Sequence, residues 1–388
     1  MNAAYRRRAK ELNVSRTALY NKLNGIEPEV SAALVRESSR QLSACIDEMG
    51  GGLQNWVEGY RVKILDGNCL AATDHRLAAL RPYAAKALPG KSLVVIDPAR
   101  QLVSDIFLCP DGHAQERSLF DAVLKTAEPK DLWLADRNMG SKHFLFALNQ
   151  AQAMFVIRQH STPYWQGLDE LTLSGTTDTG TVFEQSIRGE YQGETLDLRR
   201  VVVRLKQPTR DGDSEIAILT NLPLVDADAV AIAQLYRQRW SIETLFQVVT
   251  KNFEGEIQTL GYPPAALFSF SMALVAYNIF ATVKAALRVI HGAGKVEAAL
   301  SWYYLVDEIQ STHRGMMIAI DPLYWQSWAT ADLKTLARRL LDLAAQVNLK
   351  TFLKQPRSPK KKKPPLILEP KHRHLSTKRL LEQNHLAP

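Results

Sequence analysis

In the first half of the chain, apolar positions fall into short runs typical of buried β-strands, separated by stretches of helical periodicity. Three of these runs end in an aspartate. They are VKILD (62–66), LVVID (93–97) and LWLAD (132–136). Helical patterns at 115–127 and 141–151 flank the third run, and another apolar run follows at 153–158. Strand, helix and strand in this order predict parallel strands joined by a right-handed crossover. We therefore expect residues 50–159 to form an α/β unit that starts with antiparallel strands and continues with parallel ones.

The pattern changes at residues 160–224, which are rich in glycine and threonine. Short alternating runs such as TVFEQSI, RRVVVRLK and EIAILTN predict a mostly β insertion. The α/β pattern resumes at 225–290, and helical patterns continue through 291–350. The predicted fold class is α/β, with a β-rich insertion and helical regions at both ends, followed by a tail at 351–388.

Residues 1–49 are predicted to be helical. Within them, RRRAKELNVSRTALYNKLN (6–24) holds two short helical patterns, the second beginning after an N-cap signal at Ser15. This is the outline of a helix-turn-helix, whose second helix would offer three side chains to DNA. They are Arg16, Tyr20 and Lys22. Any small pair of helices gives a similar pattern, so both interpretations stay open. The glycines at 50–52 predict a linker.

The segment 257–283 contains no charged residue and is long enough to span a bilayer. Polar side chains such as Ser271 and Asn278 interrupt it, and a helix buried in a large soluble protein has the same pattern. We expect a buried helix and no membrane contact.

Positive charge is concentrated at the C-terminal end of the chain. The net charge is +8, and residues 351–388 alone hold ten Lys and Arg against two Asp and Glu, a difference of +8. Such a run is commonly solvated and disordered, and it also suits nucleic acid, because each neutralised phosphate releases counterions. The three cysteines are scattered, which argues against a disulfide framework and predicts a reducing cytoplasm.

The three strand-end aspartates are not equivalent. Asp97 precedes Pro98 and a further strand pattern, which predicts an ordinary tight turn. Asp66 and Asp136 end other strands of the α/β unit, and the rim formed by strand ends is where open-sheet enzymes carry their chemistry. These two carboxylates are therefore candidate catalytic groups.

A third carboxylate lies in LYRQRWSIETLFQ (235–247). On one continuous helix, Tyr236, Arg239 and Glu243 would form a narrow polar stripe between apolar neighbours. Arg239 and Glu243 alone predict an i, i+4 ion pair worth a few tenths of a kcal/mol. Together with the two aspartates, Glu243 completes a set of hard oxygen ligands suited to Mg²⁺. Two such ions about 3.5–4 Å apart activate a nucleophile and stabilise the leaving oxygen of a phosphodiester.

From about residue 10 onwards, the chain resembles the DDE transposases of bacterial insertion sequences, in the branch with a Tyr-Arg-Glu-Lys signature helix. Three motifs and one longer stretch carry the resemblance. They are ILDGN with Asp66, LADRN with Asp136, the signature helix with Tyr236, Arg239 and Glu243, and EIQTLGYPPAALFSFSMALVAYN (256–278). The resemblance implies an RNase H-like core in two parts, 50–159 and 225–290, interrupted by the β insertion.

The resemblance also implies metal-dependent cleavage at transposon ends, followed by strand transfer into target DNA. Asp66, Asp136 and Glu243 would hold two Mg²⁺ ions, for which Mn²⁺ can substitute. The implied partners are double-stranded DNA, both as inverted-repeat ends and as target, and a second copy of the chain in a synaptic homodimer. The implied location is the nucleoid in the cytoplasm. Two alternatives stay open: an inactive transposase-derived DNA-binding protein, and a structure-selective nuclease with an RNase H fold that cuts without joining.

Two positions depart from the family pattern. The family lysine falls seven residues after the glutamate, which is Thr250 here, while Lys251 comes one residue later and is turned by roughly 100° on a helix. Asn138 stands where the family usually has glycine. Neither departure removes a candidate metal ligand.

The resemblance implies further DNA contacts. The candidates are Tyr236, Arg239, Lys251 and Arg137. The family's β insertion can also carry an aromatic side chain that stacks on a displaced base, and Trp165 in TPYWQG is the candidate here. The alternative for this tryptophan is a place in the core of the insertion.

Overall fold

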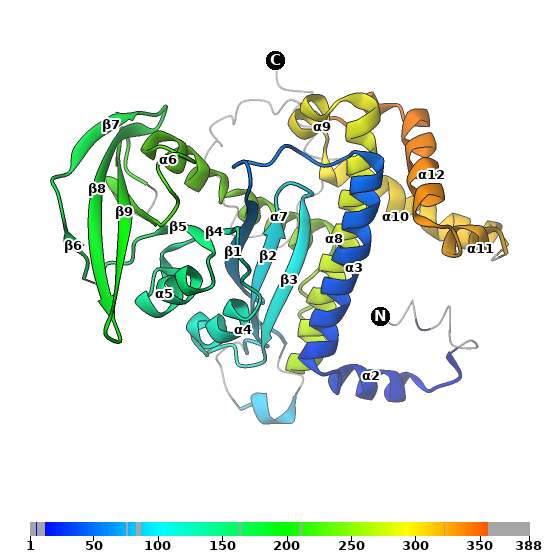
Figure 1. Cartoon of the computed structure of the whole chain (residues 1–388). Helices are drawn as coiled ribbons and strands as arrows, with labels where there is room; N and C mark the ends of the chain where they lie inside the picture. Colours follow the sequence, from blue (N-terminus) through cyan, green and yellow to red (C-terminus); the bar gives the residue numbers. More distant parts are fainter. Residues whose placement is uncertain are drawn as a thin grey trace, which may run out of the picture. The chain divides into compact units, whose positions relative to one another are not determined.

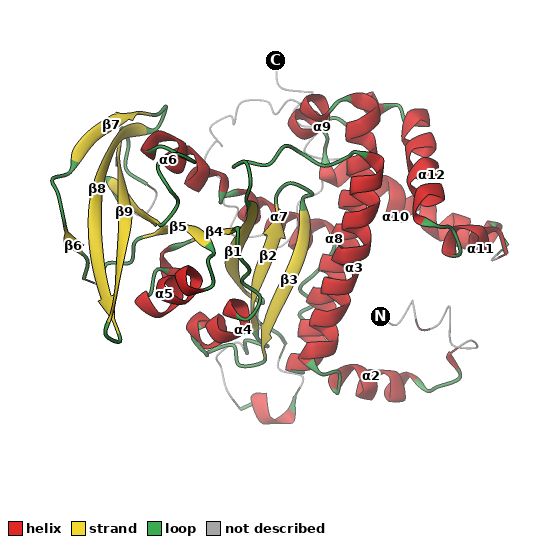
Figure 2. Cartoon of the chain, in the orientation of Figure 1, coloured by secondary structure: helices red, strands yellow, loops and turns green. Residues whose placement is uncertain are grey.

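A ten-stranded mixed β-sheet organises residues 1–353, which form one of two compact units of the chain (Figures 1 and 2). The computed structural model describes residues 5, 12–74, 77–82, 87–162, 164–209, 212–321 and 323–355. The strands are β1 (Arg61–Cys69), β2 (Lys91–Asp97), β3 (Leu102–Cys109), β4 (Asp131–Ala135), β5 (Met154–Arg158), β6 (Gln166–Gly167), β7 (Thr172–Thr176), β8 (Gly180–Tyr191), β9 (Glu194–Leu205) and β10 (Glu215–Thr220).

The strand order is β3-β2-β1-β4-β5-β10-β9-β8-β6, with β7 also paired to β8. Strands β1, β2 and β3 are antiparallel neighbours, whereas β4 runs parallel to both β1 and β5. This confirms the predicted antiparallel start and the parallel pair that follows. Strand β10 pairs antiparallel with β5, so the strands of residues 160–224 continue the same sheet instead of forming a sheet of their own.

The described residues also form helices, some of which cover the two faces of this sheet while others pack on helices. They are α2 (Arg16–Asn24), α3 (Pro28–Met49), α4 (Phe120–Leu124), α5 (Lys142–Gln150), α6 (Ala229–Gln238), α7 (Ser241–Asn252), α8 (Pro263–His291), α9 (Ala293–Ala299), α10 (Trp302–Ala319), α11 (Leu323–Ala329) and α12 (Leu333–Gln346). Four short 3₁₀ helices are η1 (Ala78–Leu80), η2 (Glu116–Leu119), η3 (Arg137–Met139) and η4 (Leu349–Phe352). In Figure 1, α3 and α8 run side by side next to β3, while α4 and α5 lie on the other side.

Alternation along the strands divides the core into two clusters, because successive side chains of a strand point to opposite faces. Ile64 belongs to the cluster that includes α3, α7 and α8, whereas Leu65 belongs to the cluster under α4 and α5. Leu134 shares the cluster of Ile64. The same alternation turns Asp66 and Asp136, each two residues further on, towards the face that carries α7.

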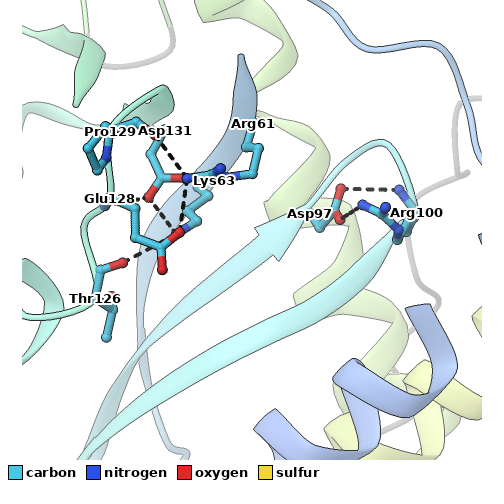
Figure 3. A network of polar contacts seen from close by, with 8 residues as sticks. All are labelled: Arg61, Lys63, Asp97, Arg100, Thr126, Glu128, Pro129 and Asp131. Atoms are coloured by element: carbon cyan, nitrogen blue, oxygen red, sulfur yellow. Dashed lines mark hydrogen bonds and ion pairs between the residues drawn. The ribbon is translucent and has the colours of Figure 1, made fainter. Parts of the chain in front are cut away.

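An ion-pair network around one buried carboxylate joins β1 to β4 at their first residues and supports their register (Figure 3). The Asp131 side chain is fully buried and accepts from Arg61 Nε at 2.9 Å and from Lys63 Nζ at 2.7 Å. The parallel pairing begins at Arg61 with Asp131 and ends at Leu65 with Ala135. This register determines which residues of β1 and β4 lie opposite each other at the other end of the pair, where the candidate carboxylates are found.

The glycines at 50–52 are not the linker that the sequence predicted. Gly50 ends α3 with a φ of 69°, the left-handed conformation that glycine adopts without strain. The Gly51 carbonyl accepts from Arg288 Nε at 2.9 Å and Nη2 at 2.6 Å, and a Cβ at Gly51 would lie 2.9 Å from the Ala285 Cβ. The small residue here allows close packing against α8.

Helix α8 is long and apolar enough, by length and composition alone, to cross a membrane, and no other helix among the described residues is. Yet 56% of its most apolar window is buried inside the protein. Ser271 and Asn278 are buried within it, and Asn278 bonds the backbone of Val103 through both its amide atoms. These contacts are those of a helix in a protein core.

Candidate active site

Asp66 and Asp136 lie next to each other in register. The β1–β4 pairing ends with Leu65 opposite Ala135, so each aspartate follows directly. Asp66 is not at the end of its strand, as the sequence suggested, because β1 continues to Cys69 along β2. Asp136 does leave the sheet: its carboxylate caps η3 and accepts from the Asn138 N–H at 2.8 Å.

The predicted single helix at 235–247 is two helices. Helix α6 ends at Gln238 and α7 begins at Ser241, with Arg239 in the turn between them. The turn directs Arg239 inwards, where its side chain is only 9% exposed.

Arg239 connects two of the three candidate carboxylates. Its Nη1 lies 2.8 Å from Asp66 Oδ2, and its Nη2 lies 3.4 Å from Glu243 Oε1. The i, i+4 pair that the sequence allowed is therefore present, but it is the longer of the two contacts. The shorter one joins the helix turn to a strand 173 residues earlier. Glu243 is 44% exposed, so its carboxylate still faces solvent.

The charges of this site are unbalanced. Burial raises the pKa of Asp66 to about 6; the Arg239 cation opposes this shift, and the carboxylates of Asp136 and Glu116 add to it. Burial works against the charge of Arg239, but the acidic groups around it, Tyr236 and Asp66 first, keep its pKa above the usual value. Ionisation of Asp66 therefore lowers the stability of the folded protein.

The rings of Tyr236 and Trp240 both lie near the Arg239 guanidinium. Its Cζ is 6.0 Å from the centre of the Tyr236 ring and 5.8 Å from that of Trp240. Tyr236 is 5% exposed and Trp240 is 57% exposed. Both line a cavity of about 580 Å³, which continues along β9 and β10 past Lys206. Tyr236 is thus a mostly buried residue that lines this cavity.

Trp165 lies away from these residues and is 5% exposed. Its ring packs so closely on Gly189 that a Cβ at that position would collide with it, and Lys142 Nζ lies 5.6 Å from the ring centre. Trp165 is therefore a core residue, as the alternative interpretation held. Its predicted stacking on a base does not fit this structure. Trp240 is the exposed aromatic residue beside the site.

The other predicted DNA contacts are at the surface. Arg137 is exposed on η3, and Lys251 is exposed in the last turn of α7. On α2, Ser15 caps the helix as predicted; Arg16 and Lys22 are exposed, whereas Tyr20 packs partly against the core. The first helix of the predicted pair, at residues 6–11, and the basic tail beyond residue 355 lie outside the described residues.

The sequence analysis missed one acidic residue of the site, Glu116. It begins η2, and its Oε2 accepts from Asn138 Nδ2 at 3.3 Å. The sequence offered a weak signal, since QERSLF places a carboxylate in the first helical turn after a strand. Many other carboxylates in the chain have equally suggestive positions, so only the tertiary contacts distinguish this one.

The donor set suits a hard divalent cation. Carboxylate oxygens are the preferred ligands of Mg²⁺, and three carboxylates, those of Asp66, Asp136 and Glu243, act on the Arg239 guanidinium. As the side chains stand, no three of the described His, Cys, Asp or Glu residues are close enough together to hold a metal ion. Arg239 lies between Asp66 and Glu243 and supplies the positive charge there. A cation shared by these two residues would take over the role of the guanidinium.

Comparison with known proteins gives one family. Residues 58–279 match the family described as Transposase DDE domain. None of the curated proteins compared with the chain matches it. Among solved structures, a piggyBac transposase synaptic complex with hairpin DNA is similar, with a TM-score of 0.34 and 12% identity. The similarity covers 74% of this chain and 57% of that one, so the chain spans little more than half the length of that protein.

Proposed function

Because the chain belongs to the Transposase DDE domain family, we propose that it is a DNA transposase that cleaves transposon ends and joins them to target DNA. Enzymes of this family transfer phosphoryl groups and generally use a divalent metal. The observation that best supports the proposal is the Arg239 guanidinium, which joins Asp66 of β1 to Glu243 of α7. Asp136 is adjacent to Asp66 in register. These contacts support our assignment of the three family positions to one site.

We assign Asp66, Asp136 and Glu243 as the residues that hold two Mg²⁺ ions, with Mn²⁺ able to substitute. Bound ions of this kind supply the charge that activates the attacking oxygen and stabilises the leaving oxygen. The strand order β3-β2-β1-β4-β5 supports the finer assignment of an RNase H-like core. In such a core the protein contributes mainly positioning and electrostatic stabilisation, so no covalent intermediate with the protein is needed.

Arg239 has a separate role in this proposal. A guanidinium bound to Asp66 cannot at the same time bind a phosphate with the same N–H groups. When cations neutralise the carboxylates, Arg239 becomes available for a DNA phosphate, with bidentate geometry that lysine cannot provide. Trp240 and the cavity beside it lie where the nucleotide next to that phosphate would pass. The partners are then double-stranded DNA and, for synapsis, a second copy of the chain.

The test is cleavage and strand transfer on DNA that carries the inverted repeats flanking the protein's own gene. Wild-type protein should act with Mg²⁺ and not with EDTA. Glu243→Gln should lose more than about 100-fold in rate, since even partners of metal ligands are worth 10–100-fold. Glu254→Gln, the same change at an exposed residue just beyond α7, should leave the rate unchanged.

Two outcomes would contradict the proposal. Nicking of branched DNA without preference for the repeat ends, and without joining, would identify a structure-selective nuclease. Salt-sensitive DNA binding with no cleavage in Mg²⁺ or Mn²⁺ would identify an inactive DNA-binding protein.

A further inference from the structure

Arg158 lies at the end of β5, in the same row of the sheet as the two candidate aspartates. The parallel pairing of β4 with β5 ends one residue before Asp136 and Arg158, just as that of β1 with β4 ends one residue before Asp66 and Asp136. Val156 belongs to the core cluster that includes α6 and α7, so Arg158, two residues further on, points to the same face. One cation thus follows two carboxylates across three adjacent strands.

The Arg158 guanidinium acts on the side chains of the site. Burial raises the pKa of Tyr236, and the cations of Arg239 and Arg158 oppose this shift. Asp136 acts on the same hydroxyl with the opposite sign. Tyr236 also lines the cavity of about 580 Å³ beside the site, and so does Ile218, the cross-strand partner of Arg158 on β10. Arg158 is therefore close both to the candidate carboxylates and to this cavity.

The bonds of Arg158 differ from those of a structural arginine. In the described part of the chain its guanidinium has one partner, Asp213, to which Nη2 donates at 2.8 Å. The guanidinium of Arg199 on β9 instead bonds Glu184 and two backbone carbonyls, which ties the chain together at three points. A guanidinium has five N–H donors, and the Arg158 side chain is 20% exposed. Arg158 therefore has both the donors and the access that a further anion needs.

Asp213 is presented to Arg158 by a short segment before β10 that has bonds of its own. The Thr209 N–H donates to the Asp213 carbonyl at 2.9 Å, and the Asp213 N–H donates to Thr209 Oγ1 at 3.1 Å. Neither bond uses the carboxylate, so both remain when its charge is removed. Arg158 lowers the pKa of Asp213, and Arg137 adds to this effect as a more distant charge. One carboxylate thus faces two arginines that are neighbours of Asp136, one in register and one in sequence.

We propose that Arg158 is a further DNA phosphate-binding residue of this site, and that Asp213 holds its guanidinium in place of a phosphate until DNA binds. A carboxylate on Nη2 repels a phosphate at either bidentate edge of the guanidinium, because both edges include this nitrogen. A phosphate on Arg158 would lie beside Asp136, where the proposed reaction needs a phosphodiester. The proposal rests on the proposed function, because it adds a binding residue and a competing carboxylate to the same site.

The experiment measures the affinity of the full-length protein for a duplex that carries the repeat ends. Fluorescence anisotropy is recorded in EDTA, which prevents cleavage, between about 50 and 200 mM salt. Arg158→Gln should weaken binding at least about 10-fold and lower the salt slope by about one phosphate contact. Asp213→Asn should tighten binding about 3-fold, because DNA no longer has to displace a carboxylate from Arg158.

Glu215→Gln is the matched control. It removes an exposed carboxylate two residues after Asp213, whose ion pair of 2.7 Å is with Arg204 instead. Both variants remove one negative charge from the same segment, but only Asp213→Asn releases Arg158. Glu215→Gln should therefore bind DNA as the wild type does.

The coupling between the two residues separates this role from a structural one. In the presence of Arg158→Gln, Asp213→Asn should no longer tighten binding. A purely structural ion pair would instead give a lower urea midpoint in both variants and no gain in DNA affinity for Asp213→Asn.

Three results would overturn the proposal: an Asp213→Asn variant that binds no tighter than Glu215→Gln, an unchanged salt slope in Arg158→Gln, or a wild-type protein that binds no duplex. The readout is binding alone. A protein that shows the coupling but does not cleave transposon ends would therefore refute the proposed function and leave the phosphate contact of Arg158 in place.

Discussion

Replacing Asp66 by asparagine should make the metal-free protein more stable at neutral pH, although it removes a candidate catalytic group. The Asp66 side chain is 17% exposed and lies near the carboxylates of Asp136 and Glu116, so its ionised form is unfavourable in the fold. Asparagine has the same shape and no charge. Its carbonyl oxygen can still accept from Arg239, which keeps the contact to the turn before α7, while the weaker bond from the Gly67 N–H is lost.

The magnitude follows from the pKa of Asp66, which rises from 3.8 to about 6 on folding. A raised pKa means that the folded protein holds this proton more tightly than the unfolded chain does. Ionisation therefore costs stability, and the cost grows as pH rises through this interval. Below pH 3.8 it is absent; at pH 8 it reaches about 3 kcal/mol, and at pH 5 about half of that.

The assay is urea and thermal unfolding of wild type and Asp66→Asn in EDTA between pH 5 and pH 8. At pH 8 the variant should melt about 4 °C higher, given the unfolding entropy expected for a chain of this size. Saturating Mg²⁺ should reduce the difference by stabilising the wild type alone. Asp97→Asn is the control: it weakens an ion pair of 2.8 Å with Arg100 and should lower stability. A variant no more stable than wild type at pH 8, or a difference that does not change with pH, would refute this reasoning.

Three further predictions follow from packing and position. Asp131→Ala leaves two cations without their buried partner and should cost about 3 kcal/mol in urea unfolding; a loss below 1 kcal/mol would contradict the anchoring role. Gly51→Ala adds a Cβ at 2.9 Å from that of Ala285 and should cost about 1–3 kcal/mol, whereas Gly294→Ala, with open space around it, should not destabilise. Thr250→Lys restores the family lysine on the Glu243 face of α7 and should steepen the salt dependence of DNA binding by about one phosphate contact; an unchanged slope would mean that this face does not contact DNA.

The sequence was sufficient to predict the pair Asp66 and Asp136, because apolar runs locate strands and a crossover makes the strands parallel. It was not sufficient to predict the turn at Arg239, where neither glycine nor proline marks a helix end. That turn accompanies a contact with a strand 173 residues away, which no local pattern contains. Trp165 shows the same limit, since an aromatic residue in a β segment suits a core and a binding face equally well.

Glycine patterns were ambiguous for a related reason. The run at 50–52 predicted a linker because glycine is common where the chain is flexible. Glycine is also the residue that allows two backbones to approach closely. Gly51 serves this second purpose beneath α8, and Gly67 likewise leaves room for a side chain, the Glu116 carboxylate. Composition alone does not distinguish a flexible glycine from one at a close contact, because the two differ only in which atoms lie next to the glycine Cα in the folded protein.

The β1–β4 pair separates a structural acidic residue from functional ones by charge balance. At its first residues, the buried Asp131 carboxylate has two cations and the Glu128 N–H as partners, which satisfies it fully. At the opposite end, Asp66 and Glu243 share one guanidinium, that of Arg239, and Asp136 lies near it without an ion pair. Buried charge without compensation costs stability, so a fold keeps it only where a ligand or a reaction uses it. The compensated end holds the two strands in register, and this register keeps Asp66 beside Asp136 despite the repulsion between their carboxylates.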